Sequence, residues 1–249
     1  MSARTLEGRV ALVTGGAHRV GRALTLTLAR EGAHVVINYH TSADAAEETA
    51  RDARAEGVDA MPFQADVADN EQVRAMVRAA IDRWGRIDVL VNSASLFRKT
   101  PFPTDDVSLW HRVLDIQVKG AFHCANAVAP HMQAQGEGHI VNILDLAGFE
   151  PWPGYGAHGM GKAAMWALTR QLALELAPQV RVNAIAPGPV LPPPGLSEAD
   201  MQRIARRTLL GRWGTPQDVA DALLFLLRSN YITGEVIFVD GGERLGRKP

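Results

Sequence analysis

Short apolar runs alternate along the chain with longer segments in which apolar residues recur at the helical period. The short runs are rich in valine and isoleucine, which predicts strands that are buried on both faces. These runs occupy residues 9–14, 34–39, 58–64, 87–92, 140–144, 180–186 and 235–240. Because strands and helical segments alternate strictly, we expect an α/β fold: a single-domain, Rossmann-like, doubly wound parallel sheet.

The helical segments have boundary signals of their own. Ser42 fits the N-cap of a helix that runs through Glu56. Asp69 precedes a segment of helical period that Gly85 ends, and Pro178 stops the last long helix. Further helices are expected over residues 19–32, 108–135 and 158–177, and from Ser197 and Thr215.

Length and composition indicate one domain over residues 1–249. The 249 residues are 47% hydrophobic, enough for a large core, and the net charge of −1 offers no basic field for nucleic acid. No apolar run reaches the roughly 18 residues of a membrane span, and the first residues lack the apolar core of a signal peptide. We therefore expect a cytoplasmic protein with a small-molecule substrate and no nucleic-acid or membrane partner.

Neither a disulfide nor a metal site is indicated by the sequence. Cys124 is the single cysteine and stands in an apolar pattern, so we expect a packed thiol. Metal ligands recur at short, regular spacings with cysteine or carboxylate partners. No such spacing occurs around His111, His123, His131 and His139.

An acid and two further ionisable groups are expected to converge at one end of the sheet. Asp145 follows the strand at 140–144, and His158 and Lys162 stand four residues apart near the start of the next helix. Residues four apart share a helix face, and strand carboxyl ends form the ligand crevice of an open α/β sheet. The sequence therefore predicts the chemistry at Asp145, His158 and Lys162.

A glycine-containing turn at residues 14–21 joins the first strand to the first helix. Such a turn presents backbone N–H groups to a pyrophosphate, although its spacing is not G-x-G-x-x-G and a plain turn would also use glycine. The second strand ends without the acid that an NAD site places there, so His40 and Ser42 are candidates for holding a 2′-phosphate. A polar loop with a capping serine explains Ser42 equally well.

Several motifs fall in a fixed order along almost the whole chain: the turn at 14–21, Asp66 and Val67, residues 92–95, Gly120, Asp145, Lys162, residues 181–188 and residues 239–242. In this order they resemble the short-chain dehydrogenase/reductases. Within that family the chain is most similar to the pteridine reductase branch. The similarity to the branch rests on Arg19, Tyr39, His40, Ser42, Ser95, Phe97, Asp145 and Tyr155.

This resemblance implies an NADP(H) site and a pocket for a flat substrate. It assigns the cofactor to Gly15, Arg19, Val20, Gly21, Tyr39, His40, Ser42, Asp66, Val67, Ser93, Ala94, Lys162, Pro187 and Gly188. It assigns the substrate to Arg19, Ser95, Phe97 and Tyr155, with Phe97 stacking the substrate against the nicotinamide. Ordinary packing is the alternative interpretation of the two aromatic side chains.

Two of the four expected catalytic positions depart from the family. His158 stands where the family has tyrosine, and Gln117 stands where it has asparagine. An imidazole can donate a proton near neutral pH, but it reaches less far than a phenol, so a bridging water or a deeper substrate would make up the difference. The alternative is that His158 is an ordinary helix residue in a chain that has lost catalysis.

Together these features predict an NADPH-dependent reductase that transfers hydride to a C=N or C=O of a pterin, dihydropterin or folate-like compound. Asp145 and His158 would donate the proton, and Lys162 would orient the ribose. Two alternatives stay open: a non-catalytic NADP(H)-binding protein, and an oxidoreductase for another carbonyl, alcohol or imine with His158 as base. The resemblance also implies a homotetramer that pairs residues 108–135 and 158–177 between subunits.

Overall fold

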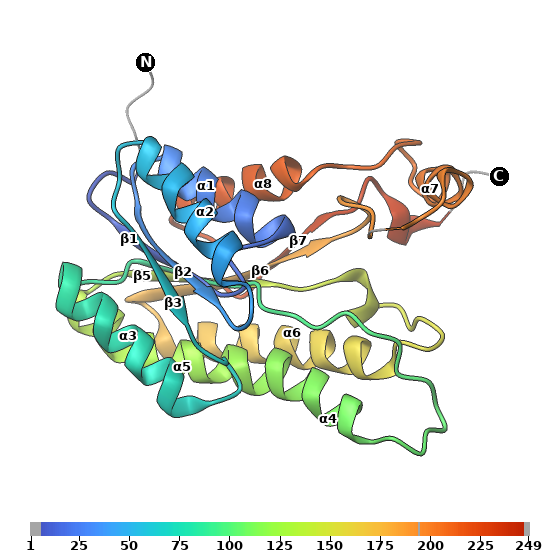
Figure 1. Cartoon of the computed structure of the whole chain (residues 1–249), viewed down its shortest axis with the longest axis horizontal. Coiled ribbons are helices and arrows are strands. Elements are labelled where there is room, and N and C mark those ends of the chain that lie inside the picture. Colours follow the sequence, from blue (N-terminus) through green and yellow to red (C-terminus); the bar gives the residue numbers. More distant parts are fainter. Residues whose placement is uncertain (1–5, 194, 247–249) are drawn as a thin grey trace.

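The computed structural model describes residues 6–193 and 195–246, in which one parallel sheet lies between two layers of helices (Figure 1). Seven strands pair in the order β3-β2-β1-β4-β5-β6-β7. Their bounds are β1 Val10–Val13, β2 His34–Tyr39, β3 Ala60–Gln64, β4 Val89–Asn92, β5 Gly138–Ile143, β6 Val180–Pro187 and β7 Val236–Val239. The expected single-domain α/β fold is confirmed. Of the expected domain 1–249, residues 1–5, 194 and 247–249 lie outside the described part.

The helices cover the sheet on both faces. Helices α1, α2 and α8 pack on one face, and α3, α5 and α6 pack on the other, with α4 alongside them (Figure 1). Their bounds are α1 Arg19–Arg30, α2 Ala43–Ala55, α3 Asn70–Trp84, α4 Ser108–Leu114, α5 Gly120–Gln135, α6 Gly156–Leu176, α7 Glu198–Ala205 and α8 Pro216–Arg228. The strand order reverses between β1 and β4, and a ligand crevice is expected at the carboxyl ends of strands at such a point.

Most predicted helix starts coincide with observed caps. The Asp69 side chain accepts hydrogen bonds from the first-turn amides of α3, and Gly85 ends that helix with φ 72°. Thr215 and Asp218 form a capping box at α8. Ser42 does occupy the N-cap of α2, but its hydroxyl makes no capping hydrogen bond. The second strand is therefore followed by a serine whose hydroxyl is not used by the helix.

The helix expected over residues 108–135 is not a uniform α-helix. A five-residue π-helical segment, Asp115–Lys119, separates α4 from α5. A π-bulge adds a residue to one turn and leaves no trace in the apolar period, so the sequence pattern could not predict it. It carries the buried Gln117. The following Gly120 packs on Val67, where any Cβ would collide with the valine side chain.

The thiol of Cys124 is fully buried on α5. Burial raises the pKa of this thiol to about 12, so the group is a packing element as expected. Across residues 6–193 and 195–246, no helix has the length and apolar character needed to cross a bilayer.

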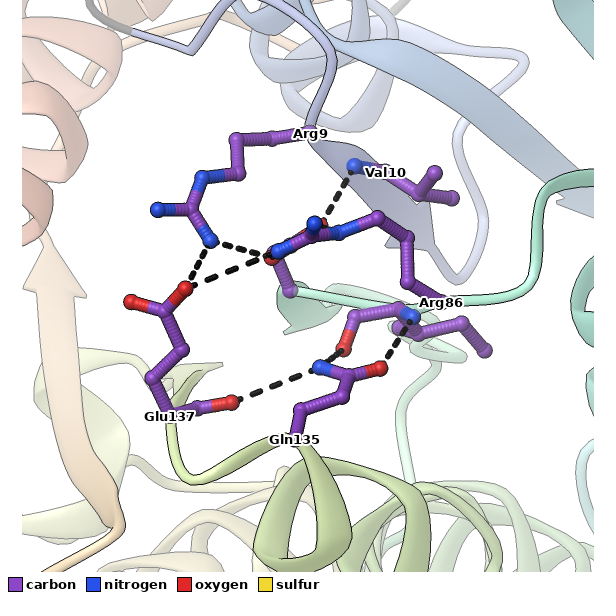
Figure 2. Close-up of polar contacts among 7 residues, drawn as sticks. Arg9, Val10, Arg86, Gln135 and Glu137 are labelled. Atoms are coloured by element: carbon purple, nitrogen blue, oxygen red, sulfur yellow. Dashed lines mark hydrogen bonds and ion pairs between the residues drawn. The ribbon is translucent and has the colours of Figure 1, made fainter.

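A buried carboxylate joins three strand ends at the amino edge of the sheet, far from the crevice. Asp88 accepts hydrogen bonds from Arg9 and from the Val10 amide, both at 2.8 Å, and from Arg86 Nε at 2.8 Å. Figure 2 shows Arg9, Arg86 and Glu137 meeting around this point. Burial raises the pKa of Asp88, but the hydrogen bonds from Arg86, Val10 and Arg9 bring it below its usual value.

His139 on β5 is expected to make the protein acid-sensitive. Its ring is buried beside Asn183, and burial, with the nearby Arg181 charge, lowers its pKa to about 3. The unfolded chain, with a histidine pKa near 6.5, therefore binds more protons at any pH between these two values. The free energy of unfolding should therefore carry no penalty from His139 above about pH 6.5. It should fall as the pH drops below that value, by about 2 kcal/mol at pH 5.

Urea unfolding at pH 7 and pH 5 measures this loss in the wild type and in His139→Met, which keeps the side-chain volume. The pH-dependent loss should be about 2 kcal/mol smaller in the variant. An equal loss in the two proteins would show that His139 is not the group responsible.

Candidate active site

Asp145, His158 and Lys162 lie together beyond the carboxyl end of β5. Asp145 caps the short 3-10 turn that follows, where its Oδ1 accepts a hydrogen bond from the Ala147 amide at 2.9 Å. His158 lies in the first turn of α6, with Nε2 at 3.4 Å from Asp145 Oδ2. Lys162, one turn later, donates from Nζ to the Ile143 carbonyl at 2.7 Å. The structure thus brings the three predicted side chains together.

The ammonium group of Lys162 is the buried charge of this cluster. Burial lowers its pKa to about 8, and the Asp145 carboxylate opposes the shift. The side chain is only 3% exposed, and its hydrogen bond to the strand carbonyl fixes the ammonium position. A fixed cation that titrates close to neutral pH is typical of a functional site.

Gln117 contacts His158 directly, which the sequence did not predict. Its Nε2 lies 2.9 Å from His158 Nδ1 and 3.0 Å from Ser95 Oγ. The other ring nitrogen, Nε2, is buried and makes no aligned hydrogen bond, although Asp145 is within 3.4 Å. The π-helical segment, the loop after β4 and α6 therefore meet at one imidazole, which has one nitrogen engaged and one available.

Two aromatic rings form the outer wall beside His158. Phe97 stacks on Tyr155 with ring centroids 4.6 Å apart and planes 14° apart, and it meets the His158 ring edge-on at 4.9 Å. The Thr100 amide donates to the Gly154 carbonyl at 2.7 Å, which ties the two loops together. No space for a ring separates Phe97 from Tyr155. A flat ligand would therefore stack on the other face of Phe97, whose side chain is 47% exposed.

The glycine-containing turn has the close approaches of a phosphate-binding turn. Gly15 has φ 61°, and a Cβ there would lie 3.1 Å from the Ala94 Cα. At Gly21 a Cβ would overlap the Gly15 carbonyl. Arg19 has φ 51°, the only positive φ of a non-glycine residue in the described ranges. The left-handed conformation costs an ordinary residue roughly 1 kcal/mol.

A cleft of about 250 Å³ extends from this turn along the ends of β1, β2 and β4. The predicted cofactor and substrate residues on its walls are Gly15, Tyr39, His40, Ser42, Asp66, Val67, Ala94 and Ser95. Other walls come from residues that the sequence did not single out: Ala17, His18, Asn38, Thr41, Ala65, Leu96, Arg112 and Ile116. The cleft therefore brings the end of β2, with no acid and a free serine hydroxyl, next to the glycine turn.

Arg112 is the charged wall residue that sequence reasoning missed. Its Nη1 lies 2.8 Å from Asp66 Oδ2, and His40 Nε2 lies 4.0 Å from the same oxygen. Burial raises the pKa of Asp66, but the hydrogen bonds from Arg112 and the Ala68 amide bring it below its usual value. Asp66 and Arg112 are far apart in sequence and belong to no shared motif, so no local signal marks the pair.

Other predicted cofactor residues lie outside the lining of this cleft. Arg19 donates to the Leu191 carbonyl at 3.0 Å and so ties the turn to the loop after β6. The Ser93 amide donates to Thr14 Oγ1 at 3.0 Å. The remaining ones are Val20 and Gly21 in the first turn of α1, Lys162 on α6, Pro187 at the end of β6, and Gly188, which packs on Asp240.

Comparisons with known proteins match nearly the whole chain. A family model described as enoyl-(acyl carrier protein) reductase matches residues 15–243. A 3-oxoacyl-(acyl-carrier-protein) reductase FabG of Staphylococcus aureus is 36% identical over 237 residues, which cover 93% of this chain and 96% of that protein.

Two solved structures superpose over almost every residue. A gluconate 5-dehydrogenase from Burkholderia cenocepacia, in complex with NADP and tartrate, has a TM-score of 0.91 and 34% identity and covers 98% of both chains. The FolM alternative dihydrofolate reductase 1 from Brucella canis, complexed with NADP, has a TM-score of 0.91 and 34% identity. That alignment covers 100% of this chain and 98% of the other.

Proposed function

Because the chain belongs to the short-chain dehydrogenase/reductase family, we propose that it is an NADPH-dependent reductase acting on a C=N or C=O bond of a pterin, dihydropterin or folate-like compound. The observation that carries this proposal is the available Nε2 of His158, buried between the Asp145 carboxylate and the Phe97 ring. A polar atom in that position can meet the heteroatom of a flat substrate lying on Phe97.

The residues around the cleft fit NADP(H). Gly15 packs closely on the Ala94 backbone because no Cβ is present, and backbone N–H groups at a helix start suit a pyrophosphate. His40 and Ser42 suit a 2′-phosphate at the strand end that lacks an acid. Asp66 and Val67 would hold the adenine, and Lys162 the nicotinamide ribose. When bound, this cofactor would supply the hydride.

The chain's own residues would handle the charge that reduction creates. His158 would donate from Nε2 to the oxygen or nitrogen on which negative charge develops, and Asp145 would orient the ring from beside the same nitrogen. Lys162, held by the Ile143 carbonyl, would contribute a positive charge behind this pair. A donor placed where charge develops stabilises the transition state more than the ground state.

NADPH should bind at least tenfold more tightly than NADH, a difference of about 1.4 kcal/mol. The reason is that the end of β2 has no acid to meet the ribose hydroxyls, while the exposed His40 side chain and the Ser42 hydroxyl could hold a phosphate. Titration by cofactor fluorescence measures both affinities. Ser42→Ala should reduce the preference without removing a helix cap, because the hydroxyl makes no capping bond. Equal affinities for the two cofactors would exclude this phosphate site.

The pterin assignment is supported by the shape and polarity of the outer wall. A heteroaromatic ring gains from stacking on the half-exposed Phe97, and the Ser95 hydroxyl and His158 Nε2 would supply polar contacts to its edge. The likeness to the FolM structure supports the same substrate class. An aliphatic ketone has no ring to stack on Phe97 and few polar atoms for the other contacts of this wall.

Phe97→Ala should weaken the binding of a dihydropterin to the NADP-loaded protein by about 1–3 kcal/mol, the scale of an aromatic stacking contact. Calorimetry measures the change. Phe102→Ala is the matched control, because Phe102 lies in the same loop but is 87% exposed, and it should leave binding unchanged. No binding of any pterin at millimolar concentration would exclude the pterin class.

Reduction of a 3-oxoacyl thioester is the second candidate function. It is favoured by the FabG relative, which is 36% identical over 93% of this chain. Such a substrate is a flexible chain with one reacting carbonyl, so it would not depend on Phe97. Comparing turnover of a 3-oxoacyl thioester and of a dihydropterin in the wild type and in Phe97→Ala separates the two candidates.

A further inference from the structure

The two departures from the family, Gln117 and His158, lie in contact with each other. Gln117 is fully buried, and its amide nitrogen faces His158 Nδ1 at 2.9 Å. Its carbonyl oxygen has no hydrogen-bond partner and faces Gly161 on α6. A Cβ at position 161 would overlap that oxygen and lie 3.1 Å from the Gln117 Cδ. The glutamine side chain therefore fits above His158 only because residue 161 is glycine.

These contacts fix the protonation of the imidazole. An amide nitrogen can only donate, so Nδ1 of His158 accepts and the single ring proton is on Nε2. The Asp145 carboxylate, 3.4 Å from Nε2, favours the same form. Turning the Gln117 amide over would aim two N–H donors at Gly161, and a buried N–H tolerates the loss of a partner less well than a carbonyl oxygen.

Ser95 is oriented by the same amide. Its hydroxyl oxygen accepts the second N–H of Gln117 at 3.0 Å, so its own hydrogen is directed elsewhere. Because one buried amide donates to both side chains, the Ser95 hydroxyl and the Nε2–H of His158 are each left to donate a hydrogen bond to another group. The charged groups around the ring are Asp145 at the end of β5 and Lys162 on α6.

Building on the proposed function, we propose that Gln117 and Gly161 are positioning residues that hold His158 as a neutral imidazole with its proton on Nε2. The site then selects substrates that present an acceptor, a carbonyl oxygen or an imine nitrogen. Hydride addition to carbon moves the C=O or C=N electron pair onto this heteroatom, and Nε2–H stabilises the resulting anion as a hydrogen-bond donor. The proton of the new O–H or N–H bond comes from water, and the hydroxide formed leaves to bulk solvent.

Nitrogen NMR of the ¹⁵N-histidine-labelled full-length protein, without cofactor or substrate, tests the assignment. The His158 signals are identified by their loss in His158→Ala. The expected pattern near pH 7.5 is a protonated Nε2 and an unprotonated Nδ1. In Gln117→Glu, whose carboxylate can only accept, a proton should appear on Nδ1. A wild-type ring with Nδ1 protonated, alone or together with Nε2, would overturn the proposal.

Kinetics supply the second test. Gln117→Met and Gly161→Ala should each lower kcat by about 10–100-fold, the scale for residues that orient a functional histidine. The two effects should not add, because a Cβ at position 161 acts only by displacing the Gln117 amide. Gln133→Met on the exposed surface of α5 is the control and should leave kcat unchanged. Additive losses would contradict the coupling.

The two tests separate this proposal from the proposed function. The NMR pattern requires no turnover, so it can hold even when no pterin is reduced. Conversely, a protein that reduces pterins with a doubly protonated His158 would keep the proposed function and lose the role given to Gln117.

Discussion

Replacement of His158 by alanine is expected to lower kcat by about 10²–10³-fold, the scale for losing one hydrogen-bond donor to developing negative charge. The substitution removes the buried polar atom that would meet the reacting heteroatom, and it removes the imidazole beside Asp145 Oδ2. The affinity for NADPH should change little, because His158 does not line the cofactor cleft. Steady-state reduction and a cofactor titration measure the two quantities separately.

The family's own residues provide the reciprocal test. A phenol at position 158 is longer than an imidazole, and Gln117 occupies the space above the present ring. His158→Tyr should therefore regain activity over His158→Ala, and more so when combined with Gln117→Asn, which shortens the side chain above it. An alanine variant as fast as the wild type would remove His158 from the mechanism.

Asp88→Asn is expected to destabilise the protein by about 1.5–3 kcal/mol, because a buried carboxylate that accepts charge-assisted hydrogen bonds is replaced by a neutral amide, while Arg9 and Arg86 keep Glu137 as a partner. The carboxylate is 7% exposed and accepts from Arg9, Arg86 and the Val10 amide. Its pKa is lower folded than unfolded, so this stabilisation is present above about pH 3.9 and lost as the pH falls through the folded value. Urea unfolding at pH 7 measures the difference.

Asp115→Asn serves as the matched control. It breaks the pair between the partly exposed Asp115 and the exposed Lys119 one helical turn later, and solvent-accessible pairs of this kind contribute about 0.5 kcal/mol or less. If Asp88→Asn lowered the free energy of unfolding no more than Asp115→Asn does, the charged cluster at the amino edge of the sheet would not contribute measurably to stability.

The fold was predictable because its signals are local. Apolar runs mark each strand, and Asp69, Gly85 and Thr215 mark helix ends by their own side chains or conformations. The π-helical segment at Gln117 was not predictable, since a single wide turn does not alter the apolar period. The unused Ser42 hydroxyl was not predictable either, because the residue type fits the cap whether or not the bond forms.

The part of the site that lies at a strand end or on one helix face was predictable. Asp145 ends a strand, and His158 and Lys162 share one face of α6, so their convergence follows from topology. The contacts made by Gln117 and Arg112 join segments that are far apart in the chain, so no spacing in the sequence indicates them. Likewise the resemblance suggested that two aromatic rings flank a substrate, whereas Phe97 and Tyr155 stack directly on each other.

Single-turnover oxidation of bound NADPH by a dihydropterin tests the central claim most directly. The protein, loaded with one equivalent of NADPH, is mixed with excess dihydropterin, and the loss of the reduced-nicotinamide absorbance is followed by stopped flow. The account predicts oxidation of one NADPH per chain in the wild type and a rate about 10²–10³-fold slower in His158→Ala. NADPH that binds but is not oxidised by any dihydropterin, or oxidation that is equally fast in both proteins, would contradict it.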